Sequence, residues 1–161
     1  MPRPTSKKIY RLSVGSITLV SSGLFVTSLF FPVFYTLGVG QAADGGPVNG
    51  LVVLIFGWIP ILACQPAWLA NPACVAPLII LWFRSHKWGV LFGGTSMLLA
   101  ASSVFTKTIP APLGDYPITG YGPGFYLWLS AIAVPLAASV FFLVLEFVRM
   151  ITEKHATDKQ L

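Results

Sequence analysis

Four long apolar segments, separated by short polar or glycine- and proline-rich stretches, dominate the hydropathy pattern of this chain. The segments cover about residues 12–38, 50–83, 89–105 and 125–148. Between Leu12 and Phe83 the single charged side chain is Asp44. A charge inside hydrocarbon is costly, so long uncharged apolar segments are typical of transmembrane helices. The pattern predicts an all-α fold, a four-span transmembrane helical bundle that forms one membrane domain over residues 1–161.

The second apolar segment, residues 50–83, is too long for one straight span of about 20 residues and too short for two. Pro66 and Pro72 lie inside it, and proline removes a backbone donor and disfavours helix in the residue before it. Asn71-Pro72 is typical of a helix start, with Asn71 as the N-cap. We therefore expect one long second span, broken at Pro66/Pro72. Its helical pieces should cover roughly residues 50–64 and 72–86.

The break has two interpretations, because irregular backbone at membrane depth must be satisfied by protein or water. In the first, the broken helix ends face a small ligand or ion, as in transporters. In the second, residues 50–64 lie against the outer membrane interface, with Trp58 in the headgroups. No intramembrane charge accompanies the break, which favours the second. The candidate structural or ligand-contact residues are Gln65, Trp68, Asn71 and Pro72.

Composition and charge support a membrane location and set the orientation. The chain is 55% hydrophobic and 9% charged, with a formal charge of +5, whereas an average soluble domain is about 25% charged. Nine of the ten Lys and Arg residues fall on one side if both termini, residues 1–11 and 149–161, are cytoplasmic. Only Lys107 then lies outside. The positive-inside rule therefore predicts a multi-pass protein of the inner (plasma) membrane with both termini in the cytoplasm.

Nucleic-acid binding and a cleavable signal peptide are both disfavoured. The basic residues do not form an aromatic-interleaved patch, so the lipid bilayer is the expected partner and nucleic acid is not. Gly40-Gln41-Ala42 ends the first segment on small residues, as signal peptides do. The apolar run before it, about 24 residues, is much longer than a signal core of about 7–15. We expect this span to be retained.

Small and hydroxylated residues indicate how the bundle packs. Gly89 and Gly93 form a Gly-xxx-Gly pair on the third span, where close helix packing is favoured. Pro135 should kink the fourth span. The serines and threonines of the first span should mostly bond to carbonyls of their own helix.

A catalytic, cofactor or metal site is not expected, because the titratable groups are scattered. His86 and His155 lie near the cytoplasmic side and are expected to be solvated. Glu146 and Arg149, three apart on a helix, suit an interfacial ion pair. There is no P-loop, HExxH or Gly-x-Ser-x-Gly motif. We therefore expect no enzymatic activity and no cofactor.

The two cysteines, Cys64 and Cys74, lie in apolar sequence and are expected to be small packing residues. Quinone-linked thiol oxidoreductases resemble this chain in size and span number. That family needs closely spaced, externally exposed cysteine pairs, which these two cysteines do not supply. The absence of such cysteine pairs argues against a thiol oxidoreductase of this kind.

Two segments, Trp68-Leu69-Ala70-Asn71-Pro72 and Gly120-Tyr121-Gly122-Pro123-Gly124-Phe125-Tyr126-Leu127-Trp128-Leu129-Ser130, carry a further resemblance. With the four-span layout, they resemble small four-span bacterial inner-membrane proteins. The resemblance implies a fold and a location, and no activity. The small size and the Tyr-, Gly- and Pro-rich outer loop, residues 107–124, favour a non-enzymatic interaction or accessory protein that binds another membrane protein. The alternative is a small transporter or channel that uses the broken second span.

Overall fold

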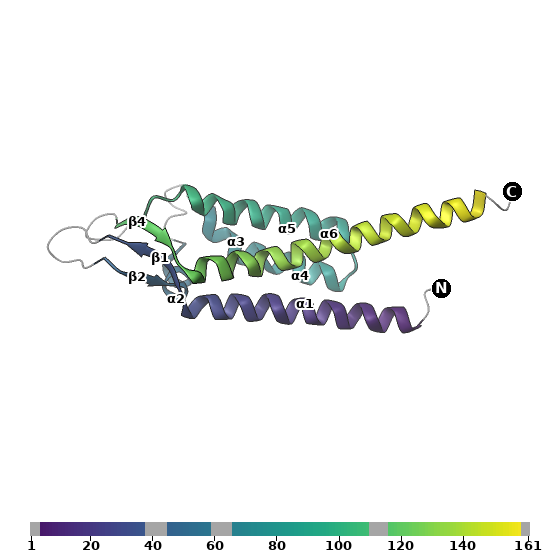
Figure 1. The fold of residues 1–161 in the computed structure, drawn as a ribbon, viewed down its shortest axis with the longest axis horizontal. Helices are drawn as coiled ribbons and strands as arrows, with labels where there is room; N and C mark the ends of the chain where they lie inside the picture. The colour runs from purple at the N-terminus through teal and green to yellow at the C-terminus, as the bar shows by residue number, and fades with distance from the viewer. Residues whose placement is uncertain (1–3, 38–44, 59–65, 110–115, 159–161) are drawn as a thin grey trace.

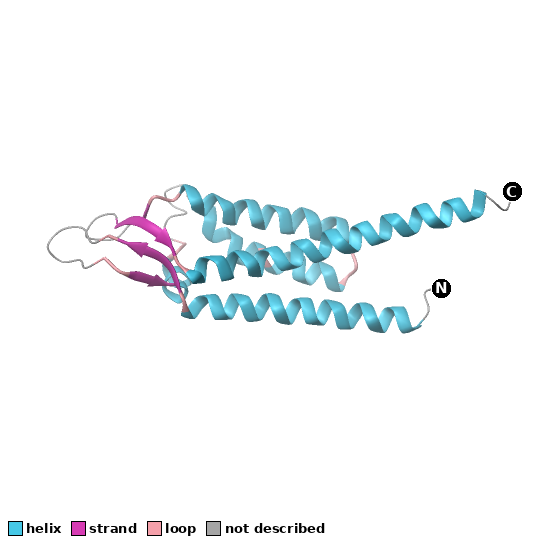
Figure 2. Ribbon diagram, in the orientation of Figure 1, coloured by secondary structure: helices cyan, strands magenta, loops and turns pink. Residues whose placement is uncertain are grey.

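Helices make up most of this computed structural model and lie side by side as an elongated bundle, with strands gathered at one end (Figures 1 and 2). The structure describes residues 4–37, 45–58, 66–109 and 116–158. Three helical segments in these ranges are long and apolar enough to cross a membrane, namely Lys8–Phe30, His86–Phe105 and Pro123–His155. A shorter apolar helical segment covers Pro66–Trp82.

The helices are α1 (Pro4–Phe30), α2 (Gly50–Phe56), α3 (Ala70–Ala73), α4 (Val75–Trp82), α5 (His86–Ala101) and α6 (Pro123–Asp158), with 3₁₀ helices η2 (Pro66–Leu69) and η3 (Ser102–Phe105). The strands are β1 (Pro32–Thr36), β2 (Pro47–Asn49), β3 (Thr108–Ile109) and β4 (Tyr116–Tyr121). The beginning of α1 and the end of α6 lie at the same end of the bundle, opposite the strands (Figure 1).

A small antiparallel sheet corrects the prediction of an all-α fold. Its strand order is β2-β1-β4-β3, and Phe34 of β1 lies opposite both Val48 of β2 and Tyr121 of β4. The first predicted span, 12–38, was too long, because α1 ends at Phe30 and β1 begins at Pro32. Proline disfavours helix in the residue before it, which explains why the helix stops there. We call this four-stranded unit the cap sheet.

The second apolar segment is interrupted, as expected, but the details differ. Helix α2 ends at Phe56, and the helical chain from Pro66 to Trp82 is divided by a turn at Cys74. Pro77 accounts for this division, because its ring clashes with the carbonyl four residues earlier and it lacks the N–H to bond there. The N-cap position of α3 is Leu69, so the prediction that Asn71 caps this helix was wrong.

The third and fourth predicted spans agree with the structure more closely. Residues 89–105 fall within α5 and η3, which together cover His86–Phe105. The segment 125–148 falls within α6, but this helix of 36 residues continues to Asp158. At 1.5 Å per residue, α6 is about 54 Å long, well beyond the roughly 30 Å of a hydrocarbon core.

Helices α1 and α6 are joined by a buried hydrogen bond that compensates for a proline. Pro135 lies inside α6 and has no N–H, so the carbonyl of Ala131, four residues earlier, loses its usual helical donor. The Ser21 hydroxyl of α1 donates to this carbonyl at 2.7 Å. Other hydroxyls of α1 bond within their own helix, as expected: Ser13 to Ile9, Thr18 to Val14, Thr27 to Gly23 and Ser28 to Phe25.

Helices α5 and α6 approach closely at the predicted glycine pair. Gly89 and Gly93 are both buried. A Cβ atom added at Gly89 would lie 2.5 Å from Ser139 Oγ, and one at Gly93 would lie 3.2 Å from the Leu136 Cα. The pair therefore lets two helix backbones meet, which is what the Gly-xxx-Gly pattern indicated.

The end of the bundle opposite the cap sheet contains an aromatic cluster around His86. This side chain is 8% exposed, so the prediction of a solvated histidine was wrong. Its ring lies 5.8 Å from that of Tyr10 on α1 and 5.3 Å from that of Phe142 on α6. Arg84, in a left-handed conformation with φ 58°, places its guanidinium 4.5 Å from the centre of the Tyr10 ring. Tyr10 also donates to the Leu81 carbonyl, which ties α1 to the end of α4.

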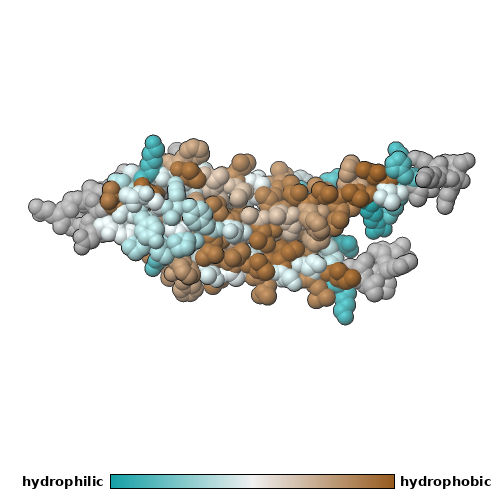
Figure 3. Space-filling model, viewed as in Figure 1, coloured by the Kyte–Doolittle hydropathy of each residue, from teal (hydrophilic) through white to brown (hydrophobic). Residues whose placement is uncertain are grey.

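The ion pair near the end of α6 is not the expected pair of Glu146 with Arg149. Arg149 bonds to Glu153 at 2.7 Å, one helical turn further on, rather than to Glu146. An i, i+4 spacing brings such side chains together on a helix face as well as the predicted i, i+3 spacing does. His155 is exposed, as expected. Figure 3 shows hydrophobic surface over the helices, paler surface over the cap sheet and hydrophilic groups near the beginning of α1 and the end of α6.

Candidate functional site

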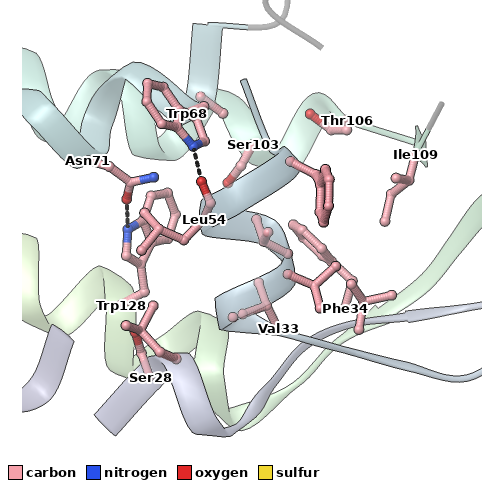
Figure 4. A pocket seen from close by; sticks show the side chains of 18 of the residues that line it. Ser28, Val33, Phe34, Leu54, Trp68, Asn71, Ser103, Thr106, Ile109 and Trp128 are labelled. Atoms are coloured by element: carbon pink, nitrogen blue, oxygen red, sulfur yellow. Dashed lines mark hydrogen bonds between the residues drawn. The ribbon is translucent and has the colours of Figure 1, made fainter. Parts of the chain in front are cut away.

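The most clearly formed cavity lies beneath the cap sheet, where the ends of several helices meet it (Figure 4). Its volume is about 170 Å³. It is lined by parts of α1, the strands β1 to β3, α2, η2, α3, η3 and α6. Segments far apart in the sequence therefore build one site.

Apolar side chains of the cap sheet form one wall of this cavity. Val33 and Phe34 of β1 are buried against Phe125 of α6. The ring of Phe34 lies 5.8 Å from that of Tyr121 and 6.2 Å from that of Phe125. Ring pairs at such spacings stabilise a structure beyond the area that they bury. The register of β1 on β4 thus holds this wall in place.

Two tryptophans and Asn71 form the opposite wall (Figure 4). The indole N–H of Trp128 on α6 donates to Asn71 Oδ1 at 2.8 Å. The indole N–H of Trp68 on η2 donates to the Leu54 carbonyl at 2.9 Å. Leu54 lies in the last turn of α2, where carbonyls lack helical donors, so Trp68 satisfies one of them. Both tryptophans therefore line the cavity with their indole nitrogens already bonded.

The remaining hydroxyl groups of the wall include two that are bonded within the protein. Ser28 donates to the Phe25 carbonyl at 2.6 Å, and Ser103 donates to the Ala100 carbonyl at 2.5 Å. None of the described residues that line the cavity carries a formal charge. The site is therefore suited to an apolar group and poorly suited to an ion.

The structure brings together two of the four residues singled out from the sequence. Trp68 and Asn71 line the cavity, whereas Pro72 is exposed on α3 and is not part of the lining. Gln65 lies outside the described residues. The bond from Trp128 to Asn71 was missed, although Trp128 belongs to the second segment that carried the resemblance. The sequence signal that could have indicated this bond was a tryptophan in an uncharged segment, since a buried indole N–H needs an acceptor.

The described ranges also show the surroundings of one of the two cysteines. Cys74 is half-buried and its thiol donates to the Asn71 carbonyl, which agrees with a packing role, while Cys64 lies outside those ranges. No three His, Cys, Asp or Glu side chains of the described chain are close enough together to hold a metal ion.

Comparison of the sequence and structure with protein-family models, curated proteins and solved structures gave no match.

Proposed function

We propose that this protein is a multi-pass protein of the inner (plasma) membrane that acts as a non-enzymatic interaction or accessory protein. In this proposal α1, the Pro66–Trp82 segment, α5 and α6 make four crossings, both termini are cytoplasmic and the cap sheet is outside. Three apolar helical segments of membrane-spanning length support the location. The basic residues near both chain ends support the orientation.

The interaction role is supported by exposed apolar side chains near the far end of α6. This helix continues past the turn between α4 and α5 (Figure 1). Its apolar side chains Val144, Phe147, Val148 and Ile151 are exposed at i, i+3, i+4 and i+7 spacing, and Leu145 and Met150 are exposed on other faces. Such a stripe is the usual face by which a helix packs on another helix. The Arg149–Glu153 pair lies on a different face of the same helix, as expected for a stripe left free for a partner.

A labelling experiment tests the location and orientation. In a cysteine-free background, Thr119→Cys on β4 should react with a membrane-impermeant thiol reagent in intact cells. Lys87→Cys, at the exposed start of α5, should react only after permeabilisation. Reaction of Lys87→Cys in intact cells would overturn the orientation. Release of the protein from the membrane fraction by alkaline carbonate would overturn the membrane location.

A purification experiment tests the interaction role. In mild detergent the protein should bring down a partner in fixed stoichiometry, and Val148→Gln or Ile151→Gln should weaken that recovery. Met150→Gln is the matched control, because Met150 is 54% exposed on the same part of α6 but lies outside the four positions of the stripe. A protein that is repeatedly solitary, or equal recovery with all three variants, would contradict the proposal.

A small transporter or channel is the second candidate, favoured by the cavity beside the interrupted crossing. Trp68 and Asn71 border both features. Vesicles containing the protein should then show uptake or current that Asn71→Leu weakens. Flux equal to that of empty vesicles would remove this candidate.

A further inference from the structure

The cavity beneath the cap sheet is bordered by side chains that also face outwards. Val52 and Phe56 of α2 line it, yet they are 47% and 58% exposed. Leu51 and Ile55, their neighbours on α2, are exposed as well. The apolar lining is therefore continuous with an apolar outer face of α2. Under the proposed membrane location, that face meets the hydrocarbon of the bilayer, and the cavity is reached from lipid.

The contents of such a cavity follow from its size and its wall. A volume of about 170 Å³ is close to the roughly 150 Å³ of an engineered apolar cavity that stays dry and binds benzene. Water would find few free donors here, because the lining is mostly apolar and both indole N–H groups and two of its four hydroxyls already donate to other atoms. An empty cavity would forfeit the dispersion contacts of its lining. A flexible apolar chain restores these contacts without bringing in a polar group.

We propose that this cavity holds the end of one acyl chain of a membrane phospholipid, about six carbon atoms by comparison with benzene. The chain enters past Val52 and Phe56 and ends against the wall made by Trp68, Asn71 and Trp128. A phospholipid is the occupant because it surrounds the exposed face of α2 in the bilayer. The proposal rests on the membrane location proposed above, and it does not depend on a protein partner.

Tryptophan fluorescence offers a direct test, because bromine atoms on an acyl chain quench an indole on contact. Trp58, Trp82 and Trp88 are each about half exposed, at 49%, 51% and 56%. Replacing these three with phenylalanine leaves Trp68 and Trp128 as reporters in the cavity wall. In vesicles of phosphatidylcholine brominated near the chain end, this reporter protein should lose fluorescence relative to vesicles of the unbrominated lipid. Bromine near the chain's carboxyl end should quench less.

Filling the cavity separates a chain inside it from lipid around the protein. Ala67 lines the cavity and is half-buried, so Ala67→Phe in the reporter protein should abolish most of the quenching. Ala101→Phe, the same change at an exposed position of α5 outside the cavity, should leave quenching unchanged. Val53→Phe is a second filling variant should Ala67→Phe fail to fold, as judged by circular dichroism and gel filtration.

Each other outcome overturns the proposal. Quenching that persists in both folded filling variants would come from lipid outside the cavity. Absence of quenching in the unfilled reporter protein would mean that no acyl chain enters. A prenyl or quinone compound could also co-purify with the protein and prevent quenching. If quenching appears only after that compound is removed, the cavity belongs to the compound and not to a phospholipid chain. If the protein resists carbonate extraction but is not quenched, this proposal fails while the membrane location stands.

Discussion

The hydrogen bond from Ser21 to Ala131 allows a precise test of how the first and last helices are joined. Ser21 and Ala131 are 5% and 2% exposed, and the bond is 2.7 Å long. Because Pro135 supplies no N–H, Ser21→Ala should leave the Ala131 carbonyl without a donor. Hydrogen bonds between membrane helices contribute about 0.6 kcal/mol on average and at most about 1.7 kcal/mol. The proline places this bond near the upper end, so Ser21→Ala should cost about 1–2 kcal/mol.

Restoring the backbone donor should remove most of this cost. In a Pro135→Ala background, the N–H of residue 135 can bond to the Ala131 carbonyl, and Ser21→Ala should then cost about 0.5 kcal/mol or less, as for a weak interhelical bond. The free energy of unfolding of the four proteins, measured by steric trapping in bicelles, gives the coupling energy. The packing change caused by Pro135→Ala cancels in this double-mutant cycle. A coupling energy of zero would refute the compensation argument.

Ser96 provides a matched control for the same reasoning. Its hydroxyl, fully buried, donates to the Ala70 carbonyl at 3.2 Å. That carbonyl also accepts the N–H of Cys74 at 2.9 Å, so it keeps a donor when the hydroxyl is removed. Ser96→Ala should therefore cost less than Ser21→Ala, about 0.6 kcal/mol or below. Equal costs would show that burial of the serine matters more than the proline.

Two further predictions concern close packing and the cavity wall. Gly93→Ala should be less stable than Gly94→Ala by about 1–3 kcal/mol, the usual cost of overpacking. Of these two positions, an added Cβ meets the Leu136 backbone only at Gly93, whereas both changes gain the same helix propensity. Thermal unfolding in detergent compares the two variants. Asn71→Leu should lower the stability by roughly 1–3 kcal/mol, because the Trp128 N–H loses its acceptor. Adding Trp128→Phe should recover part of this loss, and a loss unchanged by the second substitution would contradict the assigned bond.

The helical part of the fold was largely readable from hydropathy, whereas the cap sheet was not. Long apolar runs have few alternatives to helices, which is why α5 and η3 match the predicted third span. The cap sheet depends on pairing Phe34 with Tyr121, residues far apart in the chain. Hydropathy within a short window carries no information on such a pairing. Pro32 and the β-rich residues of β4 were local signals that could have shortened the first span.

The candidate site shows the same division between local and distant information. Trp68 and Asn71 could be picked out because two prolines flank them, but the role assigned to Asn71 was a local one, that of a helix cap. Its side chain instead accepts from Trp128, 57 positions later. His86 was misjudged for the same reason, since the rings that bury it come from α1 and α6. Local rules identify unusual residues, and the tertiary partner decides what they do.

The joining of the first and last helices has a consequence for how the protein is made. Ser21 and Ala131 are 110 positions apart, and β1 pairs with β4 just before α6 begins. Since a chain emerges from the ribosome with its N-terminus first, α1 in the proposed membrane location must wait in the bilayer until residue 131 has been synthesised. Until then its serine has no partner on α6. Until β4 has been made, β1 also keeps an open edge, which is a site for unwanted strand pairing. Synthesis of β4 and α6 thus closes both features, and a chain interrupted before Tyr116 would be left with the two of them exposed to chaperones and proteases.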